Sequence, residues 1–284
     1  METIKSLDTL SFDTLFNAFN EAFADYEIHV NSDELRVLLS RRGFVPALSF
    51  GLFEDDRLVS FTLNGIGEFN GEKTAYDTGT GTIKEYRGRG YASRIFTESL
   101  PYLKESGVTQ YLLEVLQHNT KAVSVYRKLG FEVTREFNYF RQTSSSVSIP
   151  QRVLSTSYRI EESGYGQSHN FKRFRDFNPS WQNSFESIAR RKDDFKVFCA
   201  YKGDIIVGYI IFEPGSGDIT QIAVDKSHRR RGLATALLAK ALECNRHTSV
   251  KLINAEVSCV SITAFLDSCG IPLQGKQFEM IKKL

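Results

Sequence analysis

The sequence predicts an α/β protein that contains one folding unit twice. Helix-like and strand-like apolar patterns alternate along the 284 residues and appear in the same order in both halves. The segments YRGRGYA and HRRRGLA each separate a strand-like run from a helix-like run, and their arginines Arg87 and Arg229 are 142 positions apart. The helix-ending Gly130 and Gly270 are 140 positions apart, so the two copies are in step.

The first copy begins with two helical patterns and continues with alternating strand patterns. The second helix starts with Asn, Ser and Asp and stops at Gly43, as helix ends commonly do. Pro101 is expected to kink the third helix. The predicted elements are helices at 9–23 and 32–43, a hairpin at 46–66, a strand at 74–83, a helix at 91–105, a strand at 111–116, a helix at 119–130 and closing strands at 131–140.

A polar, serine-rich joint, RQTSSSVSIPQ, separates the copies, so the predicted domains are 1–145 and 150–284. The second copy begins with helical pieces interrupted at Pro179 and then repeats the order of the first. Its predicted elements are a hairpin at 195–213, a strand at 217–224, a corner and helix at 228–244, a strand at 250–257, a helix at 261–269 and a closing strand at 277–284.

The composition excludes several classes of function. The chain has 36 basic and 34 acidic residues, a net charge of +2 that is too balanced for a nucleic-acid or membrane-surface binder. It has no apolar run of about 18 residues and no signal-peptide pattern, which predicts a cytoplasmic protein. The four cysteines form no CxxC pair and the five histidines no cluster, so we expect no metal.

The two arginine-glycine corners predict an anion site. Each has the pattern R-x-x-G-x-A between a strand and a helix: Arg87, Gly90 and Ala92, and then Arg229, Gly232 and Ala234. Unpaired N–H groups and the positive end of the helix dipole converge there and attract an anion. The glycine lets a phosphate approach the main chain, the alanine keeps the helix close to the sheet, and arginine donors suit phosphate. The pattern therefore favours a ligand with a pyrophosphate.

Both halves resemble the GNAT superfamily of N-acetyltransferases, and the whole chain resembles a tandem pair. The resemblance implies two domains, each with a mixed, mostly antiparallel sheet whose central pair is parallel and is flanked by helices. It implies acetyl-CoA as co-substrate, with its pyrophosphate on the corner and its pantetheine arm beside the preceding strand. The implied binding residues are Thr80, Thr82, Arg87, Gly88, Arg89, Gly90, Tyr91 and Ala92 in the first half, and Ile222, Val224, Arg229, Arg231, Gly232 and Ala234 in the second.

The first half also resembles the family in the segment LEVLQHNTKAVSVYRKLGF, best known from enzymes that acetylate protein N-termini. Glu114, Asn119 and Tyr126 fall in step with the family's pattern. The resemblance implies Tyr126 as the acid that protonates the CoA thiolate and Asn119 as a ligand of the pantetheine or the reacting carbonyl. A base must deprotonate the amine. We expect Glu114 to do so through water, with Asp77 as the alternative, while amides near Thr80 polarise the thioester.

The second half keeps the anion loop but departs from the catalytic helix. The residues that align with Asn119 and Tyr126 are Ser261 and Ser268 in one register, and Cys259 and Leu266 in the other. We therefore assign acetyl transfer to a small-molecule or peptide amine to the first half. Two alternatives are an acyl-CoA sensor without transfer activity and an aminoacyl transferase with paired GNAT-like units. The resemblance further implies a monomer that acts as its own internal dimer.

Overall fold

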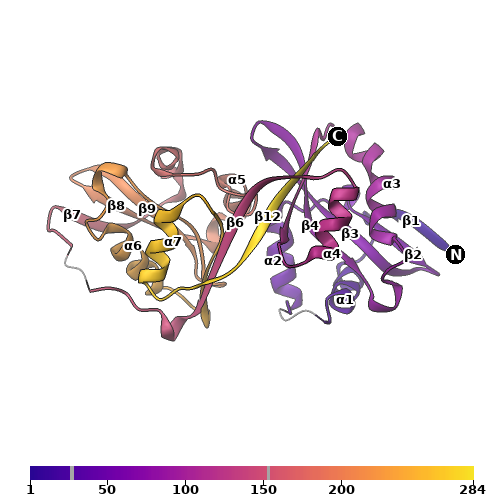
Figure 1. Ribbon diagram of the computed structural model, residues 1–284, viewed down its shortest axis with the longest axis horizontal. Helices are drawn as coiled ribbons and strands as arrows, with labels where there is room; N and C mark the ends of the chain where they lie inside the picture. The colour runs from indigo at the N-terminus through magenta and orange to yellow at the C-terminus, as the bar shows by residue number, and fades with distance from the viewer. Residues whose placement is uncertain (26–28, 152–153) are drawn as a thin grey trace. The chain divides into compact units, whose positions relative to one another are not determined.

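The computed structural model describes residues 1–25, 29–151 and 154–284, including the side chains of all of these except 167–170. The chain forms two compact units. Unit 1 consists of 1–115, 119–134 and 279–284, and unit 2 of 116–118 and 135–278. Each unit contains a mixed sheet with flanking helices (Figure 1), which confirms the predicted α/β class with two domains of one type.

The elements of the first repeat follow the predicted order, with one additional strand at the start. They are β1 (Glu2–Ser6), α1 (Phe12–Ala22), α2 (Ser32–Arg42), η1 (Pro46–Leu48), β2 (Phe50–Glu54), β3 (Arg57–Phe69), β4 (Glu72–Thr82), η2 (Lys84–Tyr86), α3 (Tyr91–Glu105), β5 (Gln110–Leu116), α4 (Thr120–Lys128) and β6 (Glu132–Thr143). Helix α3 has the predicted bounds and continues through Pro101. Helix α2 begins with a reciprocal capping box between Asn31 and Glu34 and ends at Gly43, whose φ of 79° suits glycine.

The second repeat also has an opening strand that the sequence patterns did not predict. Its elements are η3 (Ser144–Ser146), β7 (Tyr158–Ser163), η4 (Tyr165–Phe174), α5 (Phe185–Arg190), η5 (Lys192–Asp194), β8 (Lys196–Lys202), β9 (Ile205–Glu213), β10 (Asp218–Val224), η6 (Lys226–His228), α6 (Leu233–Leu242), β11 (Ser249–Glu256), α7 (Val260–Ser268) and β12 (Leu273–Lys283). Strands β1 and β7 have five and six residues, too few for a clear alternating pattern.

Helices cover both faces of each sheet. In unit 1, α1 and α2 pack on a core that includes Phe53, Phe61 and Leu63, whereas α3 packs on the opposite core around Leu52 and Val59. The alternation of side chains along a strand, adjusted by a bulge between β2 and β3, separates these two cores. In unit 2, α6 and α7 pack on one face, and η4 and α5 pack on the other.

Each sheet contains one parallel pair that opens after a short contact. In unit 1, β1 to β4 pair antiparallel, and β4 pairs with β5 in parallel over three residue pairs that end at Tyr76 and Leu112. In unit 2, β7 to β10 pair antiparallel, and the parallel partners of β10 and β11 are Asp218 and Lys251. The carboxyl-terminal parts of β4 and β10 therefore do not pair with the parallel strand. They lead directly into the arginine-glycine corners.

The last strand of each repeat does not complete its own repeat's unit. Residues 135–143 of β6 belong to unit 2, where β6 pairs antiparallel with β11 from Phe137 to Thr143. Residues 279–284 belong to unit 1, where the Leu284 N–H donates to the Thr109 carbonyl at 2.9 Å. Strand patterns alone do not specify which sheet a closing strand joins. The boundaries 1–145 and 150–284 describe the sequence repeat and stay predictions. In the compact units, most of β6 from the first repeat belongs to unit 2, and residues 279–284 from the second repeat belong to unit 1.

Candidate active site

The two corners form helix starts that leave backbone amides available to a ligand. Gly90 and Gly232 are the N-caps of α3 and α6, with left-handed φ values of 77° and 85°. Within the described part of the chain, neither helix start receives a side-chain cap. A Cβ at Gly90 would meet no protein atom within 4 Å, so protein packing leaves space in front of this backbone. An anion such as a pyrophosphate fits such a helix start.

The first arginine of each corner is bound by the protein itself, in the same way in both repeats. The Arg87 Nε donates to the Thr82 carbonyl at 3.1 Å, and its Nη atoms contact Asp25 at 3.0 Å and the Ala22 carbonyl at 2.8 Å. These contacts tie the end of β4 to the segment after α1. The sequence patterns gave no signal for Asp25, which is distant along the chain. A role of Arg87 in phosphate binding remains a prediction.

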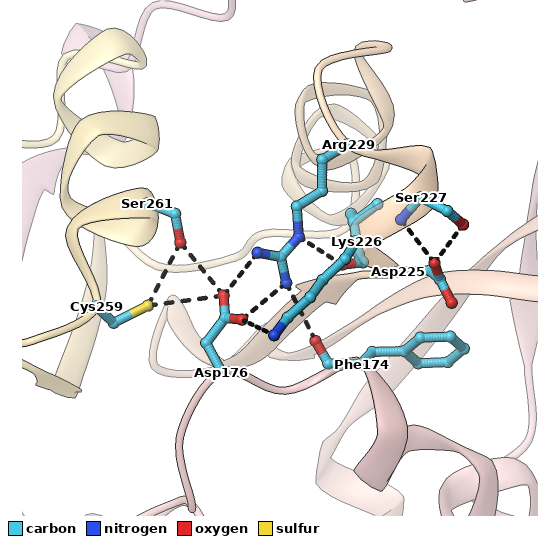
Figure 2. Close-up of polar contacts among 9 residues, drawn as sticks. Phe174, Asp176, Asp225, Lys226, Ser227, Arg229, Cys259 and Ser261 are labelled. Carbon is cyan, nitrogen blue, oxygen red and sulfur yellow. Dashed lines mark hydrogen bonds and ion pairs between the residues drawn. The ribbon is translucent and has the colours of Figure 1, made fainter.

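Figure 2 shows the matching arrangement around Arg229. Its Nε donates to the Val224 carbonyl at 2.9 Å, and its guanidinium contacts both carboxylate oxygens of Asp176, at 2.9 and 3.0 Å. Lys226 lies 4.0 Å from the same carboxylate. Asp176 therefore balances the charge of Arg229 as Asp25 balances that of Arg87. These contacts indicate that the first arginine of each corner stabilises the conformation of the corner.

The remaining corner residues have mixed surroundings. The guanidinium of Arg89 lies over the Tyr86 ring at 4.9 Å, whereas Arg231 donates to the Tyr158 hydroxyl at 3.2 Å. Gly88 has a φ of 80°, and the residue in its place in the second corner, Arg230, also has a positive φ, 64°. Tyr91 is buried and donates to Glu2, and Ala92 lies in the first turn of α3. The two corners therefore share their backbone shape despite different side chains.

Three of the predicted residues meet where β4 separates from β5. The Tyr126 hydroxyl, from α4, donates to Asp77 Oδ2 at 3.2 Å, and the Thr80 hydroxyl donates to the same oxygen at 2.8 Å. The Gly79 N–H donates to Asp77 Oδ1 at 3.0 Å. Burial raises the pKa of the Asp77 carboxyl above its ordinary value, and the hydrogen bonds from Thr80 and Tyr126 oppose the rise. Asp77 can therefore accept a proton more readily than an ordinary carboxylate.

Glu114 and Asn119 have other contacts. Glu114 Oε2 accepts a hydrogen bond from the Tyr76 hydroxyl at 3.2 Å, and burial raises the pKa of that phenol well above its ordinary value. Asn119 is the N-cap of α4, where its side-chain oxygen accepts from the Ala122 N–H at 3.2 Å. Part of the LEVLQHNTKAVSVYRKLGF pattern thus has a structural explanation. The catalytic roles of Glu114 and Asn119 remain predictions.

Thr80 and Thr82 lie on the part of β4 that pairs only with β3. The Thr82 hydroxyl is 2.8 Å from the Ser60 hydroxyl, and Thr80 and Thr82 are the register partners of Thr62 and Ser60. This position leaves the other edge of β4 directed to the opening between the parallel strands. That this segment borders the pantetheine arm stays a prediction.

Unit 2 has a cavity of about 360 Å³ beside its own parallel pair. The second-repeat residues predicted to bind CoA that line this cavity are Ile222, Val224, Arg229, Gly232 and Ala234. The start of α7 also faces it. There, the Ser261 hydroxyl donates to Asp176 Oδ2 at 3.3 Å and lies 3.4 Å from the Cys259 thiol (Figure 2). Ser268 donates to the Phe265 carbonyl and Leu266 is fully buried, so neither register places a phenol where α4 has Tyr126.

The repeated strand opening and the uncapped helix starts define a tandem α/β protein with the same arginine-glycine corner in each unit. The model of the acetyltransferase (GNAT) family matches residues 12–131 and again residues 157–260. The chain therefore belongs to the acetyltransferase (GNAT) family, and it contains the family's domain twice. This confirms the resemblance seen in the sequence.

Two curated proteins are similar to part of the chain. It is 31% identical over 96 residues to N-alpha-acetyltransferase MAK3 of Arabidopsis thaliana, which covers 34% of this chain and 50% of that protein. It is 30% identical over 97 residues to N-alpha-acetyltransferase 30 of Schizosaccharomyces pombe. This match covers 34% of this chain and 65% of that protein. The chain thus spans about half to two thirds of the length of these relatives.

Among solved structures, the fold is similar to that of a tandem GNAT protein from the clavulanic acid biosynthesis pathway, determined without AcCoA. The TM-score is 0.76 at 11% identity, with 100% of this chain and 98% of that chain covered. In the described residues, no cluster of three metal-ligating side chains occurs, and no helix is long and apolar enough to span a membrane.

Proposed function

We propose that the chain transfers an acetyl group from acetyl-CoA to an amine and that the first repeat performs the reaction. The observation that carries this proposal is the contact of Tyr126 and Thr80 with Asp77, beside the strand opening that leads to the α3 start. The corner supplies backbone donors for the pyrophosphate. The similarity to two N-alpha-acetyltransferases supports an α-amino group at a peptide N-terminus as the acceptor.

The contacts suggest a route for the proton. The neutral amine attacks the acetyl carbon, and its nitrogen must lose one proton as the C–N bond forms. Asp77 accepts this proton, because burial raises its pKa. The new C–N bond forms, the C–S bond breaks, and the CoA thiolate takes a proton from the Tyr126 hydroxyl. Tyr126 then recovers a proton from the neutral Asp77, so that one proton moves from the amine to the thiol.

Glu114 is the alternative base and would act through water. It differs from Asp77 in its contact, since the Tyr76 hydroxyl donates to it. Asp77→Asn and Glu114→Gln separate the two routes, because each replaces a carboxylate by an amide of the same shape. In the Asp77 route, D77N lowers kcat by about 10²-fold, in the range of general-base catalysis, and E114Q has a smaller effect. The opposite order would assign the base to Glu114.

The test of the activity itself is thiol release from acetyl-CoA over a panel of amines. The panel contains peptides with a free N-terminus, the same peptides with a blocked N-terminus and a free lysine side chain, and small amines. The proposal expects turnover with free α-amino groups. Binding of acetyl-CoA without release over the whole panel would contradict it and support the sensor alternative. Sedimentation or light scattering tests the expected monomer.

A further inference from the structure

The cavity of unit 2 is also lined by residues that do not belong to the arginine-glycine corner. Besides the α6 start, it is lined by Arg175, Asn183 and Tyr209. Tyr209 stacks on Phe171 at 4.0 Å and belongs to the core under η4 and α5. Leu233 at the α6 start belongs to the other core. The cavity therefore reaches a second group of polar side chains on the opposite side of the sheet.

Asn183 has an unpaired acceptor on this side. Its Nδ2 donates to the Ile253 carbonyl at 2.8 Å, and because a carbonyl only accepts, this contact fixes which end of the amide is nitrogen. The residue is 4% exposed, and no donor among the described residues reaches its Oδ1. A buried acceptor without a partner costs about 1–3 kcal/mol, so such groups are uncommon outside binding sites.

A chain of hydrogen bonds holds Asn183 in this orientation. The Tyr209 hydroxyl donates to Gln221 Oε1 at 2.7 Å, and Gln221 Nε2 donates to the Asn183 main-chain carbonyl at 2.6 Å. Both Tyr209 and Gln221 are buried. The position of Asn183 is therefore fixed at both its backbone and its amide nitrogen, and its Oδ1 is a buried acceptor without a partner in the described residues.

Arg175 places a poorly compensated positive charge at the same cavity. Its guanidinium lies over the Phe185 ring at 5.3 Å, and its buried Nε has no acceptor within the described ranges of the chain. Burial lowers the pKa of this guanidinium, as expected for a cation with poor solvation. The adjacent carboxylate of Asp176 is engaged by Arg229. Arg175 is thus available to an anion.

We propose that Arg175 and Asn183 form a binding subsite for a small organic carboxylate that carries an N–H group, the chemistry of an N-acylated amino acid. Arginine donors match a carboxylate in a bidentate manner, and Asn183 Oδ1 accepts from the N–H. Phe177 and Pro179 line the same cavity and provide apolar contact for the rest of the molecule. This subsite lies in unit 2 and does not depend on the chemistry proposed for Tyr126.

The test uses three probes on the full chain: N-benzoylglycine, its methyl ester, and N-benzoyl-N-methylglycine. The ester lacks the carboxylate charge and the N-methyl compound lacks the N–H. We expect saturable calorimetric binding of N-benzoylglycine, and at least tenfold weaker binding of the other two, which corresponds to about 1.4 kcal/mol. Arg175→Met and Asn183→Leu should each weaken binding of N-benzoylglycine to the same degree. Arg173→Met is the matched control, because Arg173 donates to the Ile206 carbonyl at 3.0 Å.

A second measurement needs no ligand. Replacing a partly buried charge that has no ionic partner by an apolar side chain removes its desolvation cost, whereas removing the Arg173 side chain loses a hydrogen bond to a main-chain carbonyl. R175M should therefore raise the midpoint of thermal unfolding, and R173M should lower it. Equal binding of the acid and its ester, absence of binding of all three probes, or a lower midpoint in R175M would overturn the proposal. A loss of CoA affinity in R175M with unchanged N-benzoylglycine binding would do so too, because it would assign Arg175 to a phosphate. Failure of the acetyl-transfer assay would leave these results unaffected.

Discussion

Gly90 gives the sharpest test of the anion corner, because the chain contains a matched control. Gly90 and Gly71 have φ values of 77° and 82°, and a Cβ at either position would meet no protein atom within 4 Å. Gly71 lies in the turn between β3 and β4, between Phe69 and Glu72. The two glycines therefore share a left-handed backbone conformation and free space for a Cβ, and they differ in that only Gly90 is the N-cap of α3.

Replacement by alanine should separate the contribution of each glycine to folding stability from its contribution to phosphate binding. In either position, alanine in a left-handed conformation costs about 1–2 kcal/mol of folding stability. Only Gly90→Ala should also place a methyl group against the ligand's phosphate. A loss of one good phosphate contact to an amide is of the order of 1.4 kcal/mol, a tenfold loss of affinity.

The assay is the KM for acetyl-CoA in the transfer reaction, combined with urea unfolding of each variant. We expect both variants to lose similar stability and only G90A to show a KM raised about tenfold. The same KM in G90A and G71A would refute the phosphate assignment. A loss of stability confined to G90A would refute the claim that the space in front of it is free.

Two further predictions concern the exchanged strand and the buried carboxyl. Met280 lies in the segment 279–284 of unit 1 and is fully buried. Met280→Ala should therefore lower the free energy of unfolding by about 2–5 kcal/mol in chemical denaturation, and it should lower acetyl transfer by the first repeat. Full activity after deletion of 279–284 would contradict this prediction. The pKa of Asp77 is raised in the folded state, so Asp77 favours folding below its unfolded-state pKa of about 3.9, and this contribution is lost as pH rises through its folded-state pKa. Stability against pH should be flatter in Asp77→Asn over that window, and identical curves for both proteins would contradict the assignment.

The repeat and most elements were predictable from the sequence because their signals are local. Helix α3 has the predicted bounds, since the glycine before it and the apolar spacing within it specify a helix directly. The strand exchange was not predictable. Strands β6 and β12 have similar alternating patterns, and such a pattern specifies a buried face but not a partner.

The candidate site was predictable only where a motif fixed it. Tyr126 and Asp77 were both identified, but their contact joins α4 to β4 across 49 residues, so the sequence left Asp77 as the second choice of base. The motif pattern likewise predicts a chemical role for Asn119, and its position as the N-cap of α4 became visible only in the structure. The partners of Arg87 and Arg229 follow from tertiary packing, and neither Asp25 nor Asp176 lies in a recognisable motif.

The most direct test of the central claim compares Tyr126→Phe with Ser268→Ala in single-turnover acetyl transfer. Tyr126→Phe removes the hydroxyl that donates to Asp77 and keeps the ring that packs on Phe131 at 5.6 Å. If the first repeat performs the reaction, this variant lowers kcat by about 10²-fold with little change in the KM for acetyl-CoA, and Ser268→Ala behaves as the unmodified protein. Unchanged turnover in Y126F together with a large loss in S268A would move the active site to the second repeat.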